Sequence, residues 1–229
     1  MVDAKDSQRT YARFAGLMFL VALATHMAGL VLVSVVEGSG TFDERSQRNV
    51  ASEGLYRLGL VFSLSGALST ILLATALYAA IKPIDGNLGM IALLFRTGET
   101  VVGATGVVTA FTVLEMSLVV RDAAGLDGNQ LGALASLFAA WPSAEVAAIF
   151  FSLGSTVFFY VFLRSPYIPK ALSAFGLVAS LCYAALWFSR LLLPDSTGLI
   201  VLGSLPILVA EVATGLWLLI KGIKAEPAT

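Results

Sequence analysis

Hydrophobic residues along this chain gather in six long runs, separated by shorter polar stretches. The runs cover residues 14–36, 55–81, 88–120, 144–163, 171–193 and 199–220. A spanning helix needs about 20 mostly apolar residues, because the hydrocarbon core of a bilayer is about 30 Å thick. The pattern therefore predicts an all-α, polytopic integral membrane protein. It would be a six-transmembrane-helix bundle over residues 14–221, with a cytoplasmic N-terminal lead at 1–13 and a cytoplasmic tail at 222–229.

The stretches between the runs predict how the spans are joined. Residues 37–54 are polar and predict an external loop, and residues 82–87 contain Pro and Gly and predict a short turn. The third run is longer than one crossing needs, so we expect it to tilt or to emerge from the bilayer. Apolar residues then recur at helical spacing over 131–141, which predicts a short interfacial helix ending at Pro142.

The composition agrees with a membrane protein. Hydrophobic residues make up 58% of the chain and charged residues 13%, and the mean hydropathy is +0.88. A water-soluble fold of this size could not bury so much apolar surface, because small proteins keep a large surface for their volume. The near balance of 14 Lys+Arg against 15 Asp+Glu also argues against a nucleic-acid partner.

The basic residues between the spans predict an orientation. If the N-terminus is inside, the inner segments hold Lys5, Arg9, Arg13, Lys82, Arg164, Lys170, Lys221 and Lys224. The outer segments then hold fewer, namely Arg45, Arg48, Arg57, Arg121 and Arg190. Lys and Arg concentrate in cytoplasmic loops of membrane proteins. We therefore expect both termini in the cytoplasm.

Three charged residues fall at mid-membrane depth, where each is costly. Arg96 and Glu99 are three residues apart, so they share one helix face and can pair. Glu211 lies ten residues before Lys221, which places it about 15 Å from the same membrane face as Arg96. The three groups can meet if the third and sixth spans touch.

Two interpretations of this cluster stay open. In the first, Arg96 bridges Glu99 and Glu211 and only fixes the helices. In the second, the cluster binds a polar head, an ion or a proton, because two carboxylates share one guanidinium. The acid without its own partner would then carry a proton or hold a cation.

A few further residues are candidates on weaker grounds. His26 lies near the middle of the first span, where a single His is either a packing residue or a ligand. Gly103 and Gly106 share a face with Arg96, and Gly66 lies on a small-residue face of the second span. Small residues at such positions allow another helix to approach closely.

Catalysis has little support in the sequence. A single His and a single Cys, Cys182, exclude sites that need two imidazoles or several thiolates, and no nucleophile or zinc motif is present. We predict no catalytic residue, no metal and no cofactor, and lean against an enzyme without excluding one. The expected partners are membrane lipids, with a homo-oligomer or an accessory role beside another membrane protein as further expectations.

Several segments resemble one family in order and spacing. They are 12–17 (ARFAGL), 52–59 (SEGLYRLG), 92–96 (ALLFR) with Glu99, 163–172 (LRSPYIPKAL), and Glu211 with 216–222 (LWLLIKG). In these the chain resembles the bacterial multi-pass membrane family catalogued as domain-of-unknown-function family 4386, from about residue 12 to residue 222. The resemblance implies a six-helix protein of the bacterial inner (plasma) membrane, and it implies no activity.

The sequence leaves three functions to weigh. The first is a non-enzymatic binding or structural membrane protein, for which Arg96, Glu99 and Glu211 would be paired and sealed from water. The second is a small-solute or proton-coupled transporter that uses Glu99 or Glu211. The third, an intramembrane enzyme acting on lipid, is least supported because His26 is the only imidazole.

Overall fold

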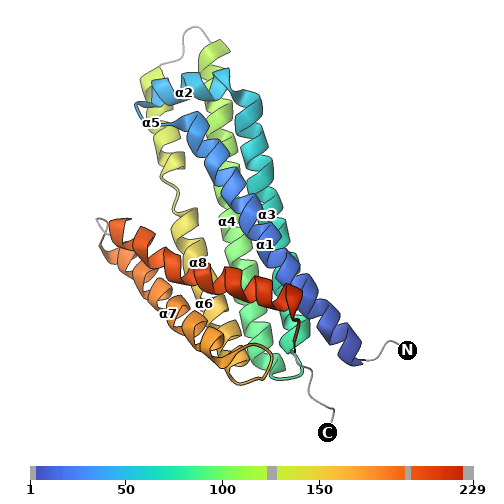
Figure 1. The fold of residues 1–229 in the computed structure, drawn as a ribbon. Helices are drawn as coiled ribbons and strands as arrows, with labels where there is room; N and C mark the ends of the chain where they lie inside the picture. The colour runs from blue at the N-terminus through green and yellow to red at the C-terminus, as the bar shows by residue number, and fades with distance from the viewer. Residues whose placement is uncertain (1–3, 123–127, 194–196, 224–229) are drawn as a thin grey trace.

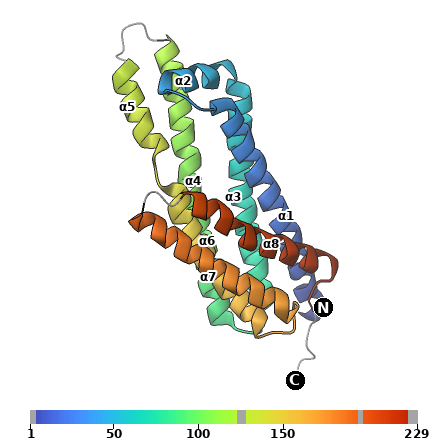
Figure 2. The same ribbon diagram turned by 60° about the vertical axis from the view of Figure 1, so that its left-hand side comes forward.

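The computed structural model describes residues 4–122, 128–193 and 197–223, and every regular element in these ranges is a helix. The helices are α1 (Ala4–Glu37), α2 (Phe42–Ala51), α3 (Glu53–Ile81), α4 (Gly86–Asp122), α5 (Gly128–Ala139), α6 (Ser143–Leu163), α7 (Lys170–Leu192) and α8 (Thr197–Ile220). Their arrangement is shown in Figures 1 and 2.

Six stretches of the described chain are long and apolar enough to cross a membrane. They are Ser7–Glu37, Glu53–Ile81, Gly86–Val119, Gln130–Leu163, Lys170–Leu192 and Gly203–Ile220. This confirms the predicted all-α, multi-pass membrane architecture. The fourth stretch takes in α5 as well as α6, which the sequence pattern treated as separate segments.

The six long helices form a closed ring. In order around it, α1 packs on α3, α3 on α4, α4 on α6, α6 on α7, α7 on α8, and α8 returns to α1. Across the described ring only α3 and α6 approach each other, and the opposite helices α4 and α8 do not. Polar groups of α4 and α8 can therefore meet inside the ring only through long side chains.

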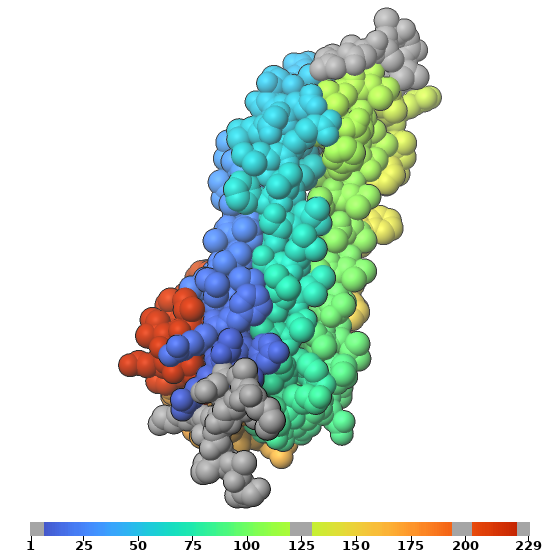
Figure 3. All heavy atoms as spheres, turned by 90° about the vertical axis from the view of Figure 1, so that its right-hand side faces the viewer, coloured from blue at the N-terminus to red at the C-terminus, as the bar shows by residue number. Residues whose placement is uncertain are grey.

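The ring is taller on one side than on the other. Figure 3 shows α1, α3 and α4 side by side along the full length, with α8 only beside their lower part. At 1.5 Å per residue α4 is about 55 Å long, whereas α7 and α8 lie obliquely against the lower half (Figure 1). The short helices α2 and α5 pack against the upper half, where both contact α4. The start of α1 and the end of α8 lie at the same lower end, as an even number of crossings requires.

Glycines allow the closest helix pairs. A β-carbon on Gly16 of α1 would lie 2.4 Å from the backbone nitrogen of Leu219 on α8. On the other side of α1, a β-carbon on Gly29 would lie 2.7 Å from the backbone nitrogen of Ser63 on α3. Small residues thus hold α1 between its two neighbours, as is usual for helix contacts in lipid.

The predicted external loop at 37–54 is wrong in one respect, because most of it is the helix α2. Thr41 caps this helix: its side chain accepts a hydrogen bond from the backbone of Glu44, and the Glu44 carboxylate accepts one from the backbone of Thr41. The segment lacks an apolar run, so hydrophobic periodicity could not show it, although the Thr-x-x-Glu capping signature is present. The helix α1 begins at Ala4, within the segment predicted as the N-terminal lead.

The short helix before Pro142 is confirmed as α5. It ends at Ala139, three residues before the proline. Whether α5 lies at a membrane interface stays a prediction. Leu137 and Trp141 are well exposed, at 70% and 55%, so this segment offers an apolar surface to its surroundings.

Candidate functional site

Arg96 is the centre of the buried polar cluster inside the ring. It lies on α4, and its side chain is 5% exposed. Its Nε lies 3.1 Å from Oε2 of Glu99, one turn further along α4. Its Nη1 lies 3.6 Å from Oε1 of Glu211, on α8. The structure therefore brings together the three charged residues that the sequence singled out.

These groups meet in a different way from the one expected. From the sequence, the three groups could meet if the helices that carry Arg96 and Glu211 touched, but α4 and α8 do not touch. The groups meet without that contact because a guanidinium on a long side chain can reach across the ring. The helix α6, which packs on α4, supplies the remaining contacts.

Two residues of α6 complete the cluster, and sequence reasoning missed both. The Ser155 hydroxyl donates to Oε1 of Glu211 at 3.1 Å and accepts from Nη1 of Arg96 at 3.4 Å. The ring of Phe151 lies under the guanidinium, 4.8 Å from Cζ to the ring centre, within the range of a cation–π contact. Phe151 and Ser155 are four residues apart and share one helix face. Neither is charged or part of a motif, so nothing in the sequence signals them.

The hydrogen-bonding capacity of the cluster is incompletely used. Arg96 Nε and Glu99 Oε2 are buried and have no hydrogen-bond partner, although they lie 3.1 Å apart as an ion pair. The hydroxyl of Thr214, one turn from Glu211, is also buried without a partner. Buried polar groups are normally satisfied, so the cluster has hydrogen-bonding positions to offer.

Exposure differs between the cation and the acids. The Glu99 side chain is 17% exposed and the Glu211 side chain 18%, against 5% for Arg96. The guanidinium is therefore enclosed, whereas each acidic side chain keeps an accessible part, although Oε2 of Glu99 itself is buried. With two acids and one cation, the site can accept one additional positive charge.

His26 lies outside this network. Its Nδ1 lies 2.9 Å from the carbonyl oxygen of Ala22, one turn earlier on α1, and its ring lies over Gly66 of α3, where a β-carbon would fall 2.4 Å from Nδ1. Among the hydrogen bonds and ion pairs of the described residues, none joins His26 to Arg96, Glu99 or Glu211. The ring thus packs on α3, and the residue as a whole is exposed at the surface of the bundle.

The glycine stripe on α4 faces α6. A β-carbon on Gly106 would lie 2.7 Å from Oγ of Ser143, whereas one on Gly103 would lie 3.7 Å from Cβ of Ala147, an ordinary contact. A side chain at position 106 would require the Ser143 hydroxyl to move, whereas one at position 103 would fit without a change. The stripe positions α6, and with it Ser155, against the charged pair.

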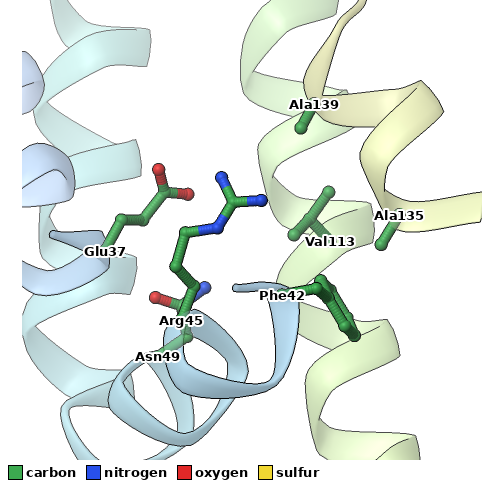
Figure 4. A pocket seen from close by; sticks show the side chains of 7 residues that line it. All are labelled: Glu37, Phe42, Arg45, Asn49, Val113, Ala135 and Ala139. Atoms are coloured by element: carbon green, nitrogen blue, oxygen red, sulfur yellow. The ribbon is translucent and has the colours of Figure 1, made fainter. Parts of the chain in front are cut away.

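A second polar group lies under α2 at the upper end of the bundle (Figure 4). It borders a cavity of ≈ 10 Å³, the space of about one water molecule. The lining residues are Glu37, Phe42, Arg45, Asn49, Val113, Ala135 and Ala139. Nε of Arg45 and Oδ1 of Asn49 are buried there without a partner. The space is too small for an organic ligand, so we interpret these polar side chains as part of the packing of α2.

Comparisons with known proteins give one match. The sequence profile described as "Domain of unknown function (DUF4386)" matches residues 14–222. No curated protein and no solved structure matches the chain.

Among the described residues, no group of three or more His, Cys, Asp or Glu side chains could hold a metal ion.

Proposed function

Because this chain belongs to the DUF4386 family, whose function is unknown, we propose its function from its own residues: it is a non-enzymatic membrane protein that binds one proton or one small cation between Glu99 and Glu211. Arg96 holds the two acids together. The bound charge compensates the carboxylate that the guanidinium leaves unmatched.

The charge count at the cluster carries this proposal. Two carboxyl groups approach one enclosed guanidinium, at 3.1 and 3.6 Å. A net negative charge at membrane depth is costly, so the site gains free energy by taking up a positive one. Both acidic side chains are partly exposed, which supports access of that charge to the site.

Proton-coupled transport is the second candidate, and the position of the site favours it. Glu99 and Glu211 belong to helices on opposite sides of the ring, and only side chains connect them. A change in the charge between them therefore changes the force that draws α4 and α8 together. Ligand sites between facing helices of a bundle are common in transporters, and a ligand shifts such an arrangement by its differential affinity.

The direct test is infrared spectroscopy of exchangeable carboxyl groups in the purified, lipid-reconstituted protein. We expect a protonated carboxyl band that shifts in heavy water and disappears in Glu99→Gln or Glu211→Gln. Glu115→Gln is the matched control. Glu115 lies on the same helix as Glu99 but far from the cluster, and its carboxylate lies 2.9 Å from the guanidinium of Arg57. If the band is absent, the site must hold a small cation instead, and the protein must then unfold at a higher temperature in Na⁺ than in a bulky cation. Absence of both contradicts the proposal.

Flux separates binding from transport. Vesicles carrying the protein and a pH-sensitive dye report proton movement under a pH gradient. A flux that Glu211→Gln abolishes and Glu115→Gln leaves intact supports the transporter. If Glu211→Gln folds and the flux does not change, transport fails and binding stands. If Glu211→Gln prevents folding, the cluster serves to hold the helices together.

The orientation and the membrane belong to the same proposal. The bias of basic residues toward the end where α1 begins supports a cytoplasmic location for both termini. The family resemblance supports the inner membrane of a bacterium.

A further inference from the structure

Basic side chains cover the lower end of the bundle, where α1 begins and α8 ends. We call this surface the basic end and define it by six exposed residues from four parts of the chain: Arg9, Arg13, Lys82, Arg164, Lys170 and Lys221. Among the described side chains at this end, the acidic partner is Asp85 alone. The surface therefore carries a large excess of positive charge.

Contacts between its turns show that these residues form one surface. The side chain of Gln8 donates to the carbonyl oxygen of Ala80 at 2.9 Å and also to the Tyr167 hydroxyl, so α1 is tied to α3 and to the turn between α6 and α7. Arg164 in that turn lies 3.6 Å from Asp85 in the turn between α3 and α4. Asp85 also accepts a hydrogen bond from the backbone of Leu88. The one acid is thus already engaged.

Aromatic rings lie one helical turn inside two of the cations. Nζ of Lys82 lies 5.9 Å from the ring centre of Tyr78, and Cζ of Arg164 lies 5.6 Å from that of Tyr160. Tyr160 is 43% exposed. Tyrosines at the level of the headgroups, with cations extending beyond them, are the pattern of a membrane interface.

The opposite end has a different charge. Around α2 it carries the acids Glu37, Asp43, Glu44, Glu53 and Glu115 with the cations Arg45, Arg48 and Arg57. Arg57 is paired with Glu53 and Glu115 at 2.7 and 2.9 Å, and Arg48 donates to the carbonyl oxygens of Glu37 and Ser39. Arg57 and Arg48 are therefore engaged inside the protein at this end. At the basic end Arg164 pairs with Asp85 and Lys170 donates to the carbonyl oxygen of Leu163, but the cations remain in excess over the one described acid.

We propose that the basic end binds the phosphate groups of anionic phospholipids in the leaflet it faces. The tyrosines beside two of its cations match the pattern of a membrane interface, and its positive charge is complementary to the negative charge of the headgroups. Each Lys or Arg near an anionic surface contributes about 1 kcal/mol, which corresponds to about five-fold in affinity. Several such residues give a marked preference for anionic over zwitterionic lipid.

The test is a competition between two lipids in one sample. The full chain in detergent is mixed with equal amounts of phosphatidylglycerol and phosphatidylcholine that share the same acyl chains, and native mass spectrometry counts the adducts. We expect phosphatidylglycerol adducts to dominate. The variant Arg13→Gln/Arg164→Gln/Lys221→Gln should lower the ratio at least ten-fold. The control Arg45→Gln/Arg48→Gln/Arg57→Gln removes the same charge at the other end and should keep the ratio.

In the lipid competition, the proposal would be overturned by equal binding of both lipids by the unaltered chain, by an unchanged ratio in the basic-end variant, or by loss of the ratio in the control alone. A ratio abolished by equimolar glycerol phosphate would identify a site for free phosphate and not for lipid. A salt titration of the unaltered chain needs no variant: the ratio must fall from low to high salt, and a ratio that does not change contradicts a charge-based site.

Discussion

Gly66 of α3 lies directly against the imidazole ring of His26 on α1, so closely that a β-carbon at position 66 would fall 2.4 Å from Nδ1. The packing of α1 on α3 at mid-height depends on this missing side chain. The relationship explains two residues that the sequence could only list separately, a single histidine and a glycine in different spans.

Gly66→Ala should destabilise the protein by about 1–3 kcal/mol, because the added methyl group forces the His26 ring to move. The measurement is reversible unfolding in detergent. Gly54→Ala is the control on the same helix, since nothing lies within 4 Å of its β-carbon position. His26→Ala in the Gly66→Ala background should restore much of the loss. No recovery would mean that the backbone, not the ring, sets the limit.

Gly16→Ala should be more harmful than Gly103→Ala. The β-carbon at position 16 would lie 2.4 Å from a backbone nitrogen of α8, which no side-chain rotation can relieve, whereas at position 103 the nearest atom is at 3.7 Å. We expect Gly16→Ala to open the ring between α1 and α8, with a loss of several kcal/mol or of folding. Thermal stability in detergent checks it. Equal stability of the two variants would contradict the packing described for α8.

Arg96→Met should cost about 3–5 kcal/mol, because it leaves two carboxyl groups without their cation in a buried place. Neutralising both acids as well, in Arg96→Met/Glu99→Gln/Glu211→Gln, should recover most of that loss. Denaturant unfolding of the single and triple variants measures the difference. If the triple variant is as unstable as Arg96→Met, then shape and not charge holds the cluster together.

Labelling with a membrane-impermeant maleimide tests the orientation. Cys182 is the natural thiol and is exposed on α7, so Cys182→Ala supplies the background. Ser39→Cys lies between α1 and α2, and Pro166→Cys lies in the turn between α6 and α7. In intact cells we expect labelling of Ser39→Cys alone, with Pro166→Cys labelled only after the membrane is opened. The reverse pattern would place the termini outside.

Sequence reasoning did well on the spans because hydrophobicity is a local property. Each run reports its own need to leave water, whatever its neighbours are, and residues 144–163 and 171–193 fall within one residue of α6 and α7. It did poorly on α2, which has no apolar run and depends on a cap and on contacts with α1, α4 and α5. The candidate charges were found for the same local reason, since a charge inside a span is conspicuous.

The sequence by itself determined six segments that are long and apolar enough to cross a membrane, and it placed Arg96, Glu99 and Glu211 within two of them. Only the tertiary structure decided which helices are neighbours, because small contact residues and a closed ring are set by shapes that meet from distant parts of the chain. It placed Ser155 and Phe151 beside Arg96, separated His26 from the cluster, and kept α4 and α8 apart. Whether a segment enters the membrane follows from its own free energy of transfer from water to lipid. Which helices become neighbours there follows from how their surfaces pack.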